Sequence, residues 1–170
     1  MRAIVVLFSI FFAVSQGQGT DLFEQLRAFN PYWEKHTEHF EGKAAKSIHN
    51  DVDYVQAHLA EVLEMLFKAP TSQLSADQRA TRKELIAVLT DYAHQGRFPI
   101  NYYRQERIPV FIDEHDTYCA VGYLMRHMGE EAMARRIAAT NNYAWVREIE
   151  EPGLAAWQEA SGFSLEELKL

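Results

Sequence analysis

The chain has very little cysteine: Cys119 is the only one among its 170 residues. A single cysteine cannot form an intramolecular disulfide, so the fold has to be stabilised by a hydrophobic core. Proline and glycine are also sparse, with five and eight residues, whereas helix-forming residues are plentiful. That balance favours an α-helical protein.

The chain has no excess of positive charge. Its 17 Lys and Arg residues stand against 24 Asp and Glu residues, which gives a net charge of −7. Nucleic-acid binding usually requires a basic surface that meets the phosphates. Only residues 104–107 are locally basic, and acidic residues lie close to them. We therefore expect no nucleic-acid partner.

An apolar run covers residues 3–14, next to a positively charged start at Arg2 and before several small residues. This pattern is typical of a signal peptide. A membrane anchor or a buried first helix are the alternatives, but the run is short for a bilayer span, which needs about 20 residues. We expect residues 1–17 to be a signal peptide that is cleaved near Gly17. The protein would then be secreted or periplasmic, with no stable membrane anchor.

Residues 18–170 show helical patterns along most of their length and no internal repeat. Apolar residues recur every three or four positions, most clearly over residues 50–68. Capping boxes at Ser75 and Ser164 predict the starts of two further helices. We predict a compact single-domain all-α bundle of about six to eight helices. One long ordered loop precedes at most one short β segment near residues 110–112.

Cys119 is the first candidate for chemistry, because ionisable residues precede it and an apolar helix is predicted over residues 118–128. A thiol in the first turn of that helix would lie where the helix dipole favours a thiolate. His115, oriented by Asp113 or Asp116, could then act as its base. The sequence would in that case encode a Cys-dependent hydrolase or acyl transferase.

Two features favour a structural role for Cys119. In enzymes with this arrangement the base lies well downstream of the cysteine, and the only later histidine, His127, is about 12 Å along the same helix. The acidic residues that precede the cysteine also raise the pKa of a thiol. We therefore expect Cys119 to pack as a small core residue. Asp113 or Asp116 would cap the helix.

A pair of histidines is the second candidate site. His36 and His39 are three residues apart in an aromatic stretch that we predict to be a short helix, so they would share a face. Glu38 and Glu41 lie close in sequence, and this spacing can chelate zinc. Surface histidines on an acidic segment are nevertheless more common than metal sites of this kind. We therefore expect no cofactor.

Several short motifs follow one another in the second half of the chain. They read RIPVFID, CAVGYL, PGLAAW and SGFSLEEL, and lie between Gly96 and Leu168. This series resembles the pattern RxPxFID…CAVGYL…PxLxxW…SGxxxxEL of an uncharacterised family of secreted bacterial proteins. The matching residues are Arg107, Pro109, Phe111, Asp113, Cys119, Gly122 and Trp157. The resemblance implies export and a helical fold, and it implies no catalytic mechanism. The chain departs from the pattern at Asp116, where glycine is typical.

We therefore predict an exported helical protein with a non-catalytic binding or structural role. Its partner would be a protein or a small molecule. Two alternatives stay open: a Cys-dependent hydrolase or acyl transferase that uses Cys119 with His115, and a metal-binding protein that uses His36 and His39.

Overall fold

The computed structural model describes residues 21–103 and 108–170, which form seven α-helices and three 3-10 helices. The α-helices are α1 (Leu22–Phe29), α2 (Asp51–Lys68), α3 (Ala76–Gln95), α4 (Ala120–His127), α5 (Glu131–Asn141), α6 (Leu154–Ser161) and α7 (Leu165–Leu168). The 3-10 helices are η1 (Pro31–Lys35), η2 (Thr37–Phe40) and η3 (Val146–Glu148). The predicted all-α class is confirmed. The predicted signal peptide and residues 104–107, which include Arg107 of the motif series, lie outside the described residues.

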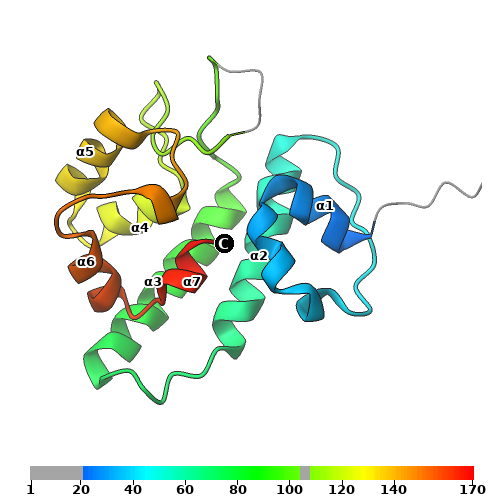
Figure 1. Ribbon diagram of the computed structural model, residues 1–170, viewed down its shortest axis with the longest axis horizontal. Helices are drawn as coiled ribbons and strands as arrows, with labels where there is room; N and C mark the ends of the chain where they lie inside the picture. The colour runs from blue at the N-terminus through cyan, green and yellow to red at the C-terminus, as the bar shows by residue number, and fades with distance from the viewer. Residues whose placement is uncertain (1–20, 104–107) are drawn as a thin grey trace, which may run out of the picture.

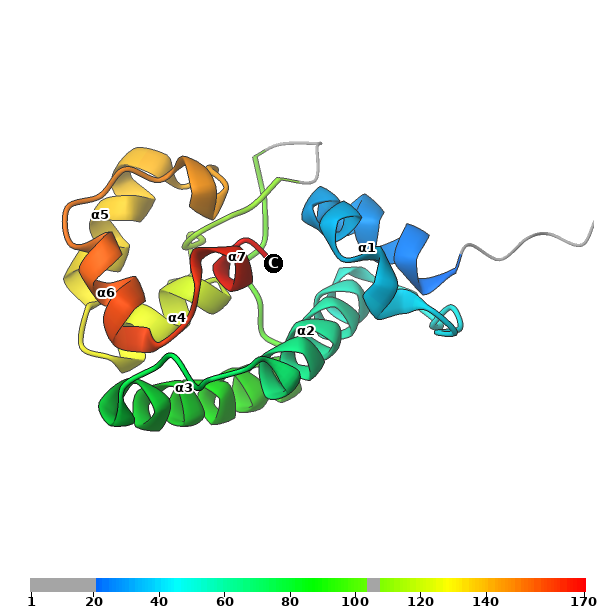
Figure 2. The ribbon, with the colours of Figure 1, turned by 60° about the horizontal axis from the view of Figure 1, so that its bottom comes forward.

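Helices α2 and α3 are the long central elements, and the remaining helices form a group on either side of them (Figure 1). Helix α1 packs against α2, with η1 and η2 beside it, whereas α4 and α6 pack against α3 and α5 packs on α4. In both views α7 and the C-terminal end of the chain lie between the two groups (Figure 2). The C-terminal residues can therefore contact both groups.

Local sequence signals explain where several helices begin and end. Asp21 and Asn50 accept hydrogen bonds from the first turns of α1 and α2, at 2.8 and 3.0 Å. The capping boxes predicted at Ser75 and Ser164 are present at the starts of α3 and α7. Gly96 ends α3 with a φ of +63°, a left-handed conformation that favours glycine.

The β pairing stays within the predicted limit of one short segment, whereas the predicted aromatic helix differs from the structure. Over the described residues, the only β pairing is a single bridge between Ile112 and Tyr118. The aromatic stretch after α1 forms η1 and η2, which are separated at His36, instead of one helix. Trp33 is completely buried there, and its ring packs against Phe40 and other rings. We attribute the division into η1 and η2 to the packing of this bulky side chain. The spacing of apolar residues along the sequence does not predict such packing.

A buried ion pair fixes α7 to the central helices. Arg82 of α3 is 4% exposed, and its guanidinium donates hydrogen bonds to the carboxylate of Glu167 at 2.6 and 3.0 Å. It also donates to the carbonyl oxygens of Leu66 and Gly162, both at 3.1 Å. A Cβ atom at Gly162 would lie 2.7 Å from the carbonyl oxygen of Gln78, so this close approach requires glycine. Arg82 thus joins α2, α3 and α7 and positions the C-terminal residues.

Candidate functional site

Cys119 is the N-cap residue of α4, which begins at Ala120. Its Sγ accepts a hydrogen bond from the backbone N–H of Gly122 at 3.4 Å. Asp113 instead accepts hydrogen bonds from three backbone N–H groups at 2.9 to 3.1 Å, and Asp116 forms an ion pair with α5. The prediction that one of these two aspartates caps the helix is therefore wrong, because the cysteine occupies the capping position and both carboxylates have other partners.

The surroundings of Cys119 and His115 differ sharply. Cys119 packs against the core, and burial raises the pKa of its thiol to about 11. The side chain of His115 is 61% exposed, its Nε2 lies 3.7 Å from a carboxylate oxygen of Glu114, and its ring stands edge-on to Tyr102. The structure thus places the thiol in a packed wall and the imidazole at the surface. This arrangement does not favour a reactive thiolate at neutral pH.

Cys119 belongs to the wall of a cavity of about 600 Å³. Helices α2, α3 and α4, the segments on either side of them and the C-terminal residues all line this cavity. Its lining is mostly apolar and includes Val55, Leu59, Val62, Phe111, Leu124 and Phe163. Asp51 and Arg147, which also line it, are exposed and mark where it meets the surface. The volume lies in the range of small-molecule sites, about 300–1,000 Å³.

Two buried polar residues of the cavity wall, Asn30 and His58, are occupied by the chain itself. Nδ2 of Asn30 donates to the main-chain oxygens of Lys169 and Leu170, at 3.1 and 2.9 Å. Nδ1 of His58 accepts a hydrogen bond from Nε1 of Trp33 at 3.0 Å, and the imidazole also hydrogen-bonds the backbone of Leu170. Because an indole N–H can only donate, the proton of the neutral imidazole is on Nε2.

The remaining buried polar groups of the wall are also paired. Burial lowers the pKa of His58 to about 4, so this imidazole is neutral at pH 7. The hydroxyl of Tyr92 donates to the carbonyl oxygen of Tyr118 at 2.9 Å, and Glu167 accepts from Arg82. The polar side chains that could bind a polar group of a ligand are already hydrogen-bonded to other parts of the chain. The cavity therefore suits an apolar molecule better than a polar substrate.

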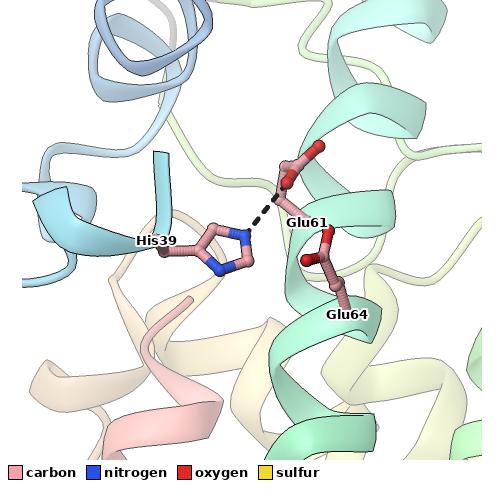
Figure 3. Close-up of side chains that lie close together, drawn as sticks. All are labelled: His39, Glu61 and Glu64. Carbon is pink, nitrogen blue, oxygen red and sulfur yellow. Dashed lines mark hydrogen bonds and ion pairs between the residues drawn. The ribbon is translucent and has the colours of Figure 1, made fainter. Parts of the chain in front are cut away.

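His36 and His39, the candidate metal-binding pair from the sequence, have different surroundings. The ring of His36 lies 5.7 Å from that of Tyr32, between centroids, and its Nε2 is buried without a hydrogen-bond partner. Burial lowers the pKa of this imidazole. His39 points towards α2, where its Nε2 lies 2.9 Å from Oε2 of Glu61 (Figure 3). The structure thus brings His39 to a partner that the sequence pattern did not single out.

A charged cluster surrounds this contact, and we call His39, Glu61 and Glu64 the HEE cluster. Their ligand-type atoms lie within 4.8 Å of one another. Nζ of Lys43 lies among them, 3.0 Å from Nε2 of His39 and 2.7 Å from Oε2 of Glu64, and it also donates to Glu61. Burial alone would raise the pKa of Glu61, but hydrogen bonds from Lys43 and Lys46 lower it.

Sequence reasoning missed several residues of both sites. His58 carried a signal, because it lies within the apolar stripe of α2 next to Leu59. Glu61 carried none, since acidic residues of an amphipathic helix usually face solvent. Asn30 directly follows α1, a position that suggests no more than the end of a helix. Its contact with the C-terminal residues spans about 140 positions of sequence and has no local signature.

Comparisons with protein-family models, with curated proteins and with solved structures found no match to the chain. The resemblance to a family of secreted bacterial proteins therefore stays a prediction. Within residues 21–103 and 108–170, no helix combines the length and the apolar character that crossing a membrane requires. A proposal about function has to rest on the geometry of the two sites.

Proposed function

We propose that the protein is an exported, non-catalytic binding protein that takes an apolar small molecule into its cavity. The observation that carries this proposal is a space of about 600 Å³ whose buried polar side chains are already hydrogen-bonded within the chain. Burial of apolar ligand surface contributes about 25 cal/mol per Å². A polar ligand group left without a partner costs about 1–3 kcal/mol. The export part of the proposal rests on the residue pattern of the N-terminus.

The alternative of a Cys-dependent hydrolase that uses Cys119 with His115 has less support. Its nucleophile would have to ionise against a thiol pKa of about 11, and its base is largely exposed beside Glu114. The cavity position of Cys119 fits its role as a small wall residue. Binding without catalysis therefore accounts for more of the described geometry.

A fluorescence titration tests the proposal, because Trp145 lines the cavity. The other two tryptophans, Trp33 and Trp157, are 0% and 4% exposed and do not line it. We expect 1-dodecanol to change the tryptophan emission saturably, with a dissociation constant on the order of 10 µM. The change should disappear in Trp145→Phe. 1,12-Dodecanediol should bind more weakly, since its second hydroxyl would lose its hydrogen bonds to water.

A pair of matched substitutions locates the binding. Ala120→Phe places a ring in the cavity wall, whereas Ala60→Phe places the same ring on an exposed part of α2 that does not line the cavity. We expect dodecanol to bind at least about tenfold more weakly to the first variant, a loss of about 1.4 kcal/mol. The second variant should bind as the unsubstituted protein does. Equal binding by both variants would contradict the proposal.

A further inference from the structure

The HEE cluster directs three ligand-type atoms at one point. Nε2 of His39 comes from η2, and the two Oε2 atoms of Glu61 and Glu64 come from successive turns of α2 (Figure 3). All three contact the same atom, Nζ of Lys43. The three side chains therefore already form a cation site, and the cation in it is an ammonium group of the chain.

The outer oxygens of the two carboxylates are held by other lysines. Nζ of Lys46 donates to Oε1 of Glu61 at 2.7 Å, and Nζ of Lys68 donates to Oε1 of Glu64 at 2.5 Å. Bonds of this kind orient metal-binding carboxylates from outside. The inward oxygens would consequently keep their direction when Lys43 leaves the cluster.

Lys43 is less buried than the ligands of the HEE cluster that surround it. The side chains of Glu61 and His39 are 5% and 10% exposed, so these two ligands are held in place by packing. The side chain of Lys43 is 22% exposed and belongs to the segment between η2 and α2. Its four-carbon stem can turn to solvent and hydrate the ammonium group. Lys43 is thus the replaceable cation held by the HEE cluster.

We propose that the HEE cluster is a binding site for a divalent transition metal of the Zn²⁺ type, which exchanges with the ammonium group of Lys43. One imidazole nitrogen and two carboxylate oxygens are three zinc ligands, and a water completes a four-coordinate shell. The imidazole disfavours Mg²⁺ and Ca²⁺, which prefer oxygen ligands only. Lys43 leaves as an ammonium ion, so the exchange itself takes no proton from the lysine.

This site differs from the pair of histidines suggested by sequence spacing. It keeps His39, and the two glutamates of α2 take the place of His36, whose ring packs against Tyr32. It is also independent of the proposed cavity ligand, since none of its three ligands lines the cavity. Loss of metal binding would leave the proposed binding function untouched, and the reverse also holds.

Isothermal titration of ZnCl₂ into the purified, untagged protein tests the proposal. We expect one site per chain with a dissociation constant on the order of 10 µM. Lys43→Met should bind Zn²⁺ at least tenfold more tightly, because it removes the competing ammonium group. Lys46→Met is the matched control, since it removes a lysine from the outer oxygen of the same Glu61 and should not tighten binding. Glu61→Gln and Glu64→Gln should each weaken it at least tenfold.

Three results would overturn the proposal. The first is the absence of stoichiometric Zn²⁺ binding in both the unsubstituted protein and Lys43→Met, with circular dichroism showing both to be folded. The second is equal tightening in Lys43→Met and Lys46→Met, which would show a general effect of charge. The third is loss of binding in His36→Gln with retention in Glu64→Gln, which would assign the metal to the histidine pair. Glu64 is 39% exposed, so its substitution should not unfold the protein.

Discussion

Helix α2 carries polar residues on two faces, and the partners of these residues differ between the faces. On the cavity face, His58 is hydrogen-bonded by Trp33 and by the C-terminal backbone, and the space beside it stays apolar. On the charged face, Glu61 contacts His39 and Lys43, and Glu64 contacts the same ammonium group of Lys43. The first face suits an apolar molecule, and the second suits a cation.

The difference comes from the segments that pack on each face. The C-terminal residues bring main-chain oxygen atoms to the cavity face, and these accept hydrogen bonds from Asn30. The segment from η2 to Lys46 brings charged side chains to the other face. One amphipathic helix can therefore support two unrelated sites. The segments that pack on it determine whether its buried polar side chains are hydrogen-bonded individually or gather around one cation.

The largest effect should follow from detaching the C-terminal residues from the cavity face. Arg82→Met leaves the carboxylate of Glu167 without its buried partner, which typically costs about 3–5 kcal/mol. We expect urea unfolding to show a loss of about that size, together with loss of dodecanol binding. The neighbouring exposed Lys83→Met should change the stability by less than about 0.5 kcal/mol. Unchanged stability in Arg82→Met would show that the ion pair does not anchor α7.

Mild acid should weaken the cavity face next. The unfolded chain binds a proton on His58 below a pKa of about 6.5, whereas the folded imidazole does so only near a pKa of about 4. The free energy of unfolding should consequently fall by about 3 kcal/mol between pH 7 and pH 4. A protonated Nδ1 would also oppose the indole N–H of Trp33.

Urea unfolding of His58→Gln at several pH values isolates this contribution. The variant should lose most of the pH dependence between pH 5 and pH 6.5, above the range in which carboxylates with a lowered pKa, such as those of Glu61 and Glu167, become protonated. A smaller slope should remain, because burial also lowers the pKa of His36. An identical pH dependence in the variant and the unsubstituted protein would exclude His58 as its source.

The thiol of Cys119 should react about two orders of magnitude more slowly in the native protein than in the unfolded chain. Burial raises the thiol pKa from 9.0 to about 11, so the thiolate at pH 7.5 is about 100-fold scarcer than in the unfolded chain. Iodoacetamide should label the native protein at least about 100-fold more slowly than the protein in urea. Rapid labelling of the native protein with a pH midpoint near neutrality would instead favour the catalytic alternative with His115.

A smaller effect should separate the two glutamates of the charged face. Glu61→Gln replaces a carboxylate that is 5% exposed and contacts Lys43, Lys46 and His39, so we expect a loss of about 2 kcal/mol in urea unfolding. Glu64→Gln changes a carboxylate that is 39% exposed, and the loss should be about 0.5 kcal/mol. Equal losses in the two variants would mean that burial does not distinguish their ion pairs.

Much of the fold could be predicted because its signals are local. The apolar period of α2, the capping serines of α3 and α7 and the glycine that ends α3 each act within one or two helical turns. The aromatic stretch of η1 and η2 was predicted less well, because the burial of Trp33 depends on residues far along the chain such as His58. Tertiary packing there overrides the helical period.

The sites could be predicted only in part. Cys119 was expected to be a core residue from its apolar neighbours, and its surroundings agree with that interpretation. Its partners could not be deduced, because the cavity is formed by elements from both halves of the chain. His39 was singled out for its spacing from His36, but its ligand-type partners come from α2, about 22 residues away. Such contacts are determined by the arrangement of helices.

A nuclear magnetic resonance titration with 1-dodecanol tests most directly whether the cavity face of α2 is a ligand site. Methyl resonances of Val55, Leu59, Val62 and Leu124, all in the cavity lining, report on that face, and those of the exposed Val52 and Leu165 report on the remaining surface. A ligand bound on the cavity face should give saturable shifts confined to the first set. Unchanged methyl resonances in the lining, or shifts of similar size in both sets, would contradict binding at this face.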